Sequence, residues 1–430
     1  MIIHQNSFSY SFNFIRSTMI DIEKEATNYI RVQTTYYKKS QKPMFSGDLE
    51  ETLIPWKFST IQQDFPRDWK SLVAKIPKYT SFCSIPEHLN YKRDVNGWYN
   101  RYEPLPHRPS PGSFLHIRQF LEHMFGDQLE LGLDYLTILY KHPYQSLPIL
   151  SLISRENNTG KSTFLKLLKS IFGHNMTFNS MSDIRSTFNS DWASKLIIGI
   201  EESFDSNRKE DSEKIKNLST AMTFKLEAKG QDRFEIEFFG KIILCSNNER
   251  NFIFMDQAEI RYWVRKIPTI PKHKLDPDLL NKMIKEIPGF LFYLRSREIS
   301  VPRKTRMWFT EEQIMTQELK KIKAHYLNPV EKEIYETLTE IMDNTGIDEF
   351  SFTNGNLKTL MERNKVKVSK GELTHIIKNK WKLQPVPNAS GYTTYLYDRN
   401  GLLAEYQLKV GYLISNQILW LFISLIFVKR

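Results

Sequence analysis

The chain has 430 residues, which is enough for two or three domains that each bury a hydrophobic core. Its 40% hydrophobic and 13% aromatic content excludes a disordered chain. Its two cysteines are too few for a disulfide framework or a cysteine-based zinc site. This low cysteine content favours a reduced, intracellular protein. The formal net charge of +11 suits a polyanionic partner such as nucleic acid, although many basic proteins bind none.

The N-terminal region, residues 1–112, is rich in aromatic residues and punctuated by proline. Its opening, MIIHQNSFSYSFNFIR, has no apolar core segment and no small-residue cleavage site, so the sequence predicts no signal peptide. Closely spaced prolines at 104–112 disfavour both helix and strand, and we expect a rigid linker there. After the linker, apolar residues at three-to-four spacing predict helices over 113–141.

From residue 146 to residue 268 the pattern predicts alternating strands and helices, which is typical of an α/β domain. Three apolar runs have the continuous hydrophobicity of buried parallel strands: 148–153, 196–200 and 242–245. Residues 271–329 are basic and are expected to form a helical extension. The stretch 330–400 is expected to form helices followed by a short hairpin that turns at Gly391.

The last segment, 401–430, is nearly all apolar from Tyr412 to Val428 and ends in two basic residues. This length is marginal for a bilayer span, and polar residues interrupt it, so a membrane protein is not expected. Three explanations of the segment stay open: a tail anchor, a buried helix, and an altered reading frame at the end of the gene.

A candidate phosphate-binding loop lies between an apolar strand and an amphipathic helix, over the residues Asn157, Asn158, Thr159, Gly160, Lys161, Ser162 and Thr163. In such a loop, consecutive backbone N–H groups and the positive end of the helix dipole hold phosphates. Lys161 is expected to reach the β and γ phosphates of a nucleotide, and the Ser162 hydroxyl to ligate Mg²⁺. On this match alone, a plain turn before a helix remains a serious alternative.

Three further motifs follow the loop. Glu201 and Glu202 end an apolar strand, where Glu201 would hold Mg²⁺ and Glu202 would polarise the attacking water. Asn247 ends the next strand and can present its amide to the γ-phosphate, while Arg261 can neutralise charge on a neighbouring subunit's nucleotide. Solvated glutamates, an Asn-Asn turn and surface arginines are the structural alternatives. The order of the motifs, each after an apolar segment, favours a nucleotide-hydrolysing site over coincidence.

The motifs NNTGKST, LIIGIEE, IILCSNN and RYWVR resemble those of the superfamily 3 helicases, the hexameric AAA+ motors of DNA viruses, phages and plasmids. The similarity covers residues 150–268 and is greatest to the helicase part of phage and mobile-element primase-helicase proteins. It implies an AAA+ P-loop NTPase core with a parallel sheet, ATP and Mg²⁺ as cofactors, and a homo-hexamer on single-stranded DNA. Arg155 stands where the family has glycine, and we expect it to weaken nucleotide binding without abolishing it.

The resemblance also implies a hairpin that grips single-stranded DNA, and residues 225–239 match it. Lys229 near its tip and Arg233 on its arm are the expected phosphate contacts, and an ordinary surface hairpin is the alternative. Residues 330–400 resemble a small winged-helix module whose recognition helix, 368–383, would bring Lys378 and Lys380 to duplex DNA. A helical packing domain with solvated lysines is equally compatible with this stretch.

The sequence therefore predicts an α/β protein in five parts: a mixed and helical lead-in region (1–112), a superfamily 3 AAA+ ATPase domain (113–270), a helical extension (271–329), a winged-helix-like domain (330–400) and an apolar tail (401–430). The expected activity is ATP-dependent DNA unwinding by a ring that translocates on single-stranded DNA. It would serve phage or mobile-element replication in the cytoplasm of a bacterial host, beside a primase and a polymerase.

Two other functions were weighed from the same residues. A DNA-binding replication protein with a structural or weakly active nucleotide site is the alternative that Arg155 favours. A small-molecule phosphotransferase is disfavoured, because paired acids, a sensor asparagine and downstream arginines suit attack by water rather than transfer to a metabolite.

Overall fold

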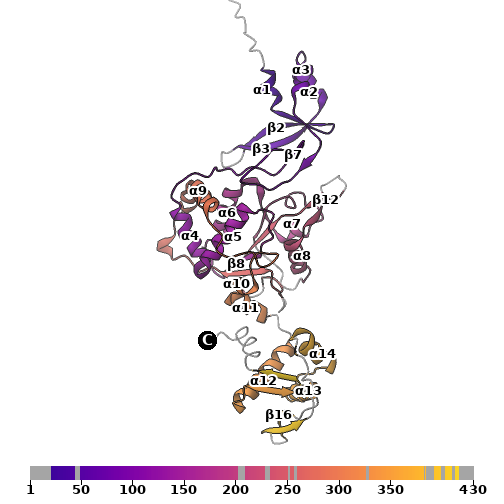
Figure 1. Cartoon of the computed structure of the whole chain (residues 1–430), viewed down its shortest axis with the longest axis vertical. Coiled ribbons are helices and arrows are strands. Elements are labelled where there is room, and N and C mark those ends of the chain that lie inside the picture. Colours follow the sequence, from indigo (N-terminus) through magenta and orange to yellow (C-terminus); the bar gives the residue numbers. More distant parts are fainter. Residues whose placement is uncertain are drawn as a thin grey trace, which may run out of the picture. The chain divides into compact units, whose positions relative to one another are not determined.

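A computed structural model describes residues 21–43, 49–201, 209–227, 233–249, 252–255, 259–325, 329–381, 383, 392–398, 402–408 and 412–415. The chain divides into two compact units (Figure 1). One comprises Met1–Ile85 with Asn90–Tyr102, and the other comprises Pro86–Leu89 with Glu103–Arg430.

The first unit combines short helices with two small sheets. Its elements are α1 (Ile22–Ala26), β1 (Tyr29–Val32), β2 (Thr35–Pro43), β3 (Leu49–Trp56), α2 (Phe58–Asp64), α3 (Trp69–Lys75), β4 (Lys78–Tyr79), β5 (Phe82–Cys83), β6 (Asp94–Val95) and β7 (Trp98–Asn100). The sheets have the orders β3-β2-β1-β4 and β5-β7-β6. Asp21 caps α1 by accepting hydrogen bonds from the N–H groups of Glu23 and Lys24. Buried aromatic and aliphatic side chains such as Tyr29, Ile61 and Leu72 form the core of this unit.

A five-stranded parallel sheet forms the centre of the second unit (Figure 1). Its strands are β8 (Ile149–Ile153), β9 (Met176–Asn179), β10 (Ile197–Glu201), β13 (Lys241–Ser246) and β14 (Tyr262–Lys266), in the spatial order β14-β8-β13-β10-β9. The predicted α/β class, with its parallel sheet, is confirmed. The three predicted apolar strands are β8, β10 and β13, and they lie in the middle of the sheet, where both faces are covered.

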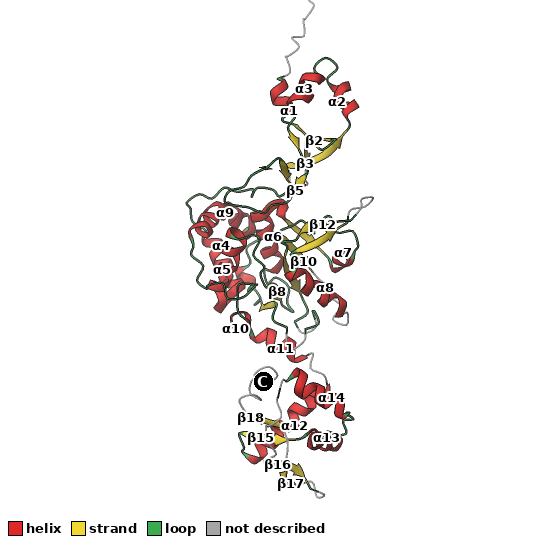
Figure 2. Ribbon diagram, turned by 45° about the vertical axis from the view of Figure 1, so that its right-hand side comes forward, coloured by secondary structure: helices red, strands yellow, loops and turns green. Residues whose placement is uncertain are grey.

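Helices cover the sheet on both faces (Figure 2). They are α4 (Leu115–Phe125), α5 (Leu129–Lys141), α6 (Lys161–Phe172), α7 (Met181–Arg185), α8 (Lys209–Thr220), α9 (Leu279–Ser296), α10 (Glu311–Ile314) and α11 (Gln317–His325), with the 3-10 turns η1 (Gly126–Gln128), η2 (Gly173–Asn175) and η3 (Lys272–Lys274). Helix α9 packs against α4, α5 and α6. The helices predicted over 113–141 are confirmed as α4 and α5, whose apolar faces are buried.

The predicted linker at 104–112 contains neither helix nor strand, and its end lies against α9. The N–H of Ser110 donates to the carbonyl oxygen of Pro288, a proline inside α9. A Cβ added at Gly289 would come within 2.7 Å of the carbonyl oxygen of Gly112. Only glycine at position 289 permits this approach of the two backbones.

The C-terminal part contains α12 (Pro329–Thr345), β15 (Glu349–Phe352), α13 (Asn354–Arg363), α14 (Lys370–Thr374), the π-helix η4 (His375–Lys380), β16 (Tyr392–Tyr397), β17 (Leu403–Leu408) and β18 (Tyr412–Ser415). The hairpin predicted here exists, but β16 pairs with β17, so the chain turns after Tyr397. Gly391, where a turn was expected, lies outside the described residues. The proline-containing first arm expected at 384–390 lies outside the described residues as well. The pairing of β16 with a strand beyond residue 400 could not be predicted from the local sequence.

The helix predicted over 368–383 is α-helical only at its start and continues as η4. Its predicted apolar face is buried, with Leu373, Ile376, Ile377 and Trp381 in the core of this part. The π-helical turn of η4 is wider than an α-helical turn. It is accompanied by two hydrogen bonds, from Lys380 Nζ and Trp381 Nε1, to the buried carboxylate of Glu331.

The start of the predicted apolar tail is a strand, because β18 pairs with β15 in antiparallel register. The rest of that tail, residues 416–430, lies outside the described residues. Within the part of the chain that the structure describes, no helix is both long and apolar enough to cross a membrane.

Candidate nucleotide site

Three of the predicted motifs follow neighbouring strands of the parallel sheet. The phosphate loop follows β8, Asn247 follows β13, and Glu201 is the last residue of β10. In the ladders, Ser246 lies opposite Ile153 and Cys245 lies opposite Glu201. Because the carboxyl ends of parallel strands meet at one edge, the structure brings these motifs together there. Glu202 lies outside the described residues.

The backbone of the phosphate loop takes left-handed conformations at two positions. Asn158 has φ 56° and Gly160 has φ 94°, and α6 begins directly after Gly160 at Lys161. Arg155 is not among the described residues with positive φ, so its backbone needs no glycine. The left-handed turns of the loop lie at 158 and 160, so the backbone conformation at Arg155 supplies no reason for weaker nucleotide binding.

We predict that Arg155→Gly changes nucleotide affinity by about twofold at most, because this exposed side chain does not determine the backbone conformation. Gly160→Ala is the contrasting variant, since its Cβ would lie 3.0 Å from the Phe120 ring at φ 94°. We expect it to weaken binding by about tenfold. Titration with a fluorescent ATP analogue compares the two. Much tighter binding by Arg155→Gly would show that this side chain does obstruct the site.

The side chain of Lys161 lies within the loop that precedes it. Lys161 is only 7% exposed, and its Nζ donates a hydrogen bond to Thr159 Oγ1 at 3.2 Å. Burial lowers the pKa of Lys161 below its usual value, while the nearby carboxylates of Glu249 and Glu201 oppose that shift. His123 lies in helix α4, and its Nε2 donates to the carbonyl oxygen of Thr159 at 2.9 Å. This hydrogen bond attaches the loop to α4.

Glu201 and Ser162 supply oxygen atoms of the kind that Mg²⁺ prefers. The Oε1 atom of Glu201 is buried and has no hydrogen-bond partner among the described residues. Ser162 is exposed in the first turn of α6. Across the described ranges, no group of three or more His, Cys, Asp or Glu side chains is placed to hold a metal. A cation here would therefore take most of its ligands from phosphate oxygens and water, as is usual for Mg²⁺ with nucleotides.

Glu249 joins three strand ends, and no sequence pattern pointed to this residue. Its Oε1 accepts a hydrogen bond from the N–H of Arg155 at 3.0 Å, and its Oε2 accepts one from Lys266 Nζ, also at 3.0 Å. Burial alone would raise the pKa of Glu249, but these two donors outweigh it and hold the pKa below its usual value. Arg155 follows β8 and Lys266 ends β14, so Glu249 fixes the start of the phosphate loop to both neighbouring strands.

Arg261 lies at the opposite edge of the sheet. Its carbonyl oxygen accepts from the N–H of Ile149 at 2.8 Å, at the amino ends of β14 and β8. Five residues of strand separate that edge from the phosphate loop, about 16 Å at 3.3 Å per residue. Arg261 is therefore too far away to touch phosphates bound at the loop of its own chain.

A buried carboxylate holds the Arg261 side chain. Arg261 Nη1 donates to both oxygens of Glu259, at 3.3 and 3.1 Å. Lys216 Nζ of α8 lies 3.4 Å from Glu259, and both of these side chains are almost fully buried. Arg265 is different, because it is bonded to Gln128, Asp127 and the Phe125 carbonyl within its own unit.

The predicted DNA hairpin is present as β11 (Thr223–Leu226) paired with β12 (Phe234–Glu237). Lys229, expected near its tip, lies outside the described residues. Arg233 is largely exposed and forms an ion pair with Glu227. In the C-terminal part, Lys378 is exposed, whereas Lys380 forms its ion pair with Glu331.

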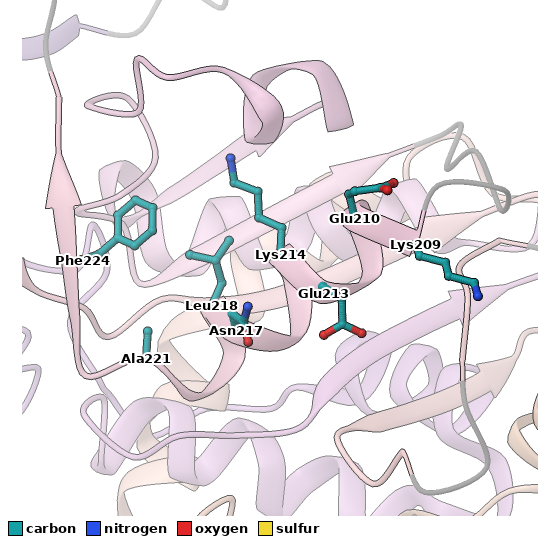
Figure 3. Close-up of a pocket in the computed structure, with 8 residues that line it drawn as sticks. All are labelled: Lys209, Glu210, Glu213, Lys214, Asn217, Leu218, Ala221 and Phe224. Carbon is teal, nitrogen blue, oxygen red and sulfur yellow. The ribbon is translucent and has the colours of Figure 1, made fainter. Parts of the chain in front are cut away.

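Two hollows lie near these elements. One, of about 490 Å³, is lined by His123, which bonds to the loop at Thr159, and by Gly126, Asp127, Gln128, Arg265, Lys266, Pro268, Met315, Thr316, Gln317 and Glu318. The other, of about 590 Å³, lies along α8 and reaches Phe224 at the base of the hairpin (Figure 3). Its charged side chains, Lys209, Glu210, Glu213 and Lys214, are of both signs and do not create a field that would attract a polyanion.

Comparison with known proteins gives one family match and several structural matches. The model of a family of unknown function, DUF5906, matches residues 152–261, a span that includes the phosphate loop, Glu201, Asn247 and Arg261. No curated protein matches the chain. The apo C-terminal region of NrS-1 (305–718) matches with a TM-score of 0.59 at 15% identity, over 90% of this chain and 95% of that chain.

A second structure of the same region, the A form, has a TM-score of 0.55 at 17% identity and covers 85% of this chain and 86% of that chain. These similarities show that the fold of the NrS-1 C-terminal region is shared along most of the chain.

Proposed function

We propose that this protein is an ATP-dependent DNA helicase of the superfamily 3, AAA+ type. The observation that carries the proposal is the placement of the phosphate loop, Asn247 and Glu201 at the ends of three adjacent strands. Asn247 follows the strand that lies between the loop strand and the acid strand, where an amide can contact both the γ-phosphate and an attacking water.

In the proposed reaction, backbone N–H groups of Asn157 to Thr163 and the Lys161 ammonium bind the phosphates of ATP. Ser162 and, through water, Glu201 hold Mg²⁺, which supplies positive charge at the phosphate oxygens. Glu202 accepts a proton from water as the water oxygen bonds to the γ-phosphorus. The bond from that phosphorus to the β–γ bridging oxygen breaks, and ADP and inorganic phosphate leave. Asn247 orients the water.

The hollow beside the loop suits the base and ribose of the nucleotide. His123 both lines this hollow and bonds to the loop at Thr159, so the hollow adjoins the place where the phosphates would end. Its volume of about 490 Å³ is sufficient for a nucleoside. Gln128, Gln317 and Glu318 offer polar atoms at its wall for the edges of a base.

The remaining parts of the proposal concern assembly and DNA. A homo-hexameric ring would place Arg261 beside the nucleotide of the next subunit and the hairpin, with Lys229 and Arg233, on single-stranded DNA in the channel. Lys378 and Lys380 would contact DNA from a winged-helix-like domain at 330–400. The proposed chain then has five parts, with boundaries after residues 112, 270, 329 and 400. The shared fold with the NrS-1 C-terminal region supports a role in phage or mobile-element replication, with a primase and a polymerase, in the cytoplasm of a bacterial host.

ATP hydrolysis measured with and without single-stranded DNA tests this proposal. We expect turnover that single-stranded DNA stimulates several-fold. DNA binding without turnover would instead establish a replication protein with a structural nucleotide site. Phosphoryl transfer to a metabolite, independent of DNA, would establish a phosphotransferase.

A further inference from the structure

Among the described residues, the hairpin of β11 and β12 forms a two-stranded sheet of its own and shares no ladder with the five-stranded sheet. Two-stranded hairpins are marginally stable in water, so this one needs support from its surroundings. Part of the support is aromatic: the Phe224 ring lies 5.4 Å from the ring of Trp192 and 5.7 Å from that of Phe238. These contacts hold the base of the hairpin, below the arms that lead to its tip.

Asn189 supports the arm at the point where the tip begins. The N–H of Glu227 donates to Asn189 Oδ1 at 2.9 Å, and the N–H of Asn189 donates to the carbonyl oxygen of Glu227 at 3.1 Å. Asn189 Nδ2 donates to the carbonyl oxygen of Lys225 at 2.9 Å. Asn189 is 6% exposed. Its three hydrogen bonds pair with the backbone of the β11 arm as a neighbouring strand would, and two of them come from its side chain.

The segment that carries Asn189 is itself attached to both elements that flank the acid pair. On one side, the carbonyl oxygen of Asn189 accepts from the N–H of Ala193 at 2.9 Å, and the fully buried Trp192 leads into β10, which ends at Glu201. On the other side, Arg185 at the end of α7 binds the buried carboxylate of Asp211 in α8, with Nε to Oδ1 at 2.8 Å. Strand β10 and helix α8 are the elements before and after residues 202–208.

We propose that Asn189 is a positioning residue that couples the DNA hairpin to the nucleotide site. This inference rests on the proposed helicase function. Because Asn189 holds the hairpin arm, and because its own segment is fixed to β10 and α8, a shift of the acid pair during hydrolysis moves the hairpin with it. Without the two side-chain bonds, one backbone hydrogen bond and the Trp192–Phe224 contact still join the hairpin to that segment, so the arm is held more loosely while the nucleotide site stays intact.

The test is Asn189→Ala in the full chain, with ATP hydrolysis measured against the concentration of an oligothymidine single strand. We expect the rate without DNA to stay within about twofold of the wild type, and the DNA concentration for half-maximal stimulation to rise about tenfold, which is the effect of losing two buried hydrogen bonds. Asn217→Ala, which removes an exposed asparagine of α8, is the matched control and should leave both quantities unchanged. Asn189→Asp keeps the acceptor for the Glu227 N–H and should fall between the wild type and Asn189→Ala.

Hydrogen exchange gives a readout that does not depend on activity. The Glu227 amide should exchange faster in Asn189→Ala and stay protected in Asn189→Asp and Asn217→Ala. Unchanged DNA stimulation in Asn189→Ala would overturn the inference, and so would equal losses of the basal and the stimulated rates. If Asn189→Ala does not fold, Asn189→Asp is the deciding variant. Faster exchange of its Glu227 amide, together with DNA stimulation as in the wild type, would refute the coupling of the hairpin to the nucleotide site. A wild-type protein without DNA-stimulated hydrolysis would instead contradict the proposed function itself.

Discussion

Lys161→Ala is expected to lower DNA-stimulated ATP hydrolysis by about a thousandfold and to weaken nucleotide binding. The Lys161 ammonium is nearly buried within the phosphate loop and is held there by Thr159, at the place where the proposed function puts the β and γ phosphates. Glu202→Gln should abolish hydrolysis as well, but with nucleotide binding preserved, because it removes only the group that accepts the proton. Phosphate release at saturating ATP and equilibrium binding of an ATP analogue measure the two effects.

Lys166→Ala is the matched control, because Lys166 is exposed on the same helix, α6, and points away from the loop-facing core. It should retain wild-type turnover. Full activity in Lys161→Ala or Glu202→Gln would show that nucleotide is hydrolysed elsewhere or that the loop does not bind phosphate.

Arg261→Ala is expected to lower hydrolysis by about a thousandfold while nucleotide binding stays at the wild-type level. Arg261 lies at the amino edge of the sheet, about 16 Å from its own phosphate loop, and under the proposed function its charge acts on the nucleotide of another subunit. Arg303→Ala, which removes an exposed arginine of a loop, should have no effect on either quantity.

Mixing Arg261→Ala with Lys161→Ala tests whether Arg261 acts on the nucleotide of a neighbouring subunit. A ring that contains Arg261→Ala and Lys161→Ala subunits would have some sites in which an intact Lys161 lies beside an intact Arg261 of the neighbour. Hydrolysis should therefore reappear in the mixture, although neither variant is active alone. A mixture as inactive as its parents would mean that Arg261 acts only within its own chain, as the partner of Glu259.

The centre of the fold was predictable because it depends on local patterns. β8, β10 and β13 are continuous apolar runs, and α6 has an apolar face at helical spacing, so short windows of sequence specified them. Strand order did not follow from such windows. That β13 lies between β8 and β10 is a matter of pairing between distant segments, and it became clear only in the structure.

The same limit explains what was missed at the site. Glu249 binds the N–H of Arg155 across 94 residues of sequence. Glu259 forms ion pairs with Arg261 and with Lys216 of helix α8. Neither glutamate belongs to a motif. At Arg155 the family pattern suggested a strained position, whereas the left-handed residues of the loop are Asn158 and Gly160.

The separation of the hairpin from the parallel sheet has an evolutionary consequence. Insertions, deletions and charge changes between β11 and β12 do not shift the register of β10 against β13, because no backbone ladder connects the two sheets. Selection can therefore change the residues between the two hairpin strands while the parallel sheet stays under its own constraints. Relatives of this chain should accordingly diverge in length and charge at 228–232 and keep the short segment around Asn189 that carries the hairpin.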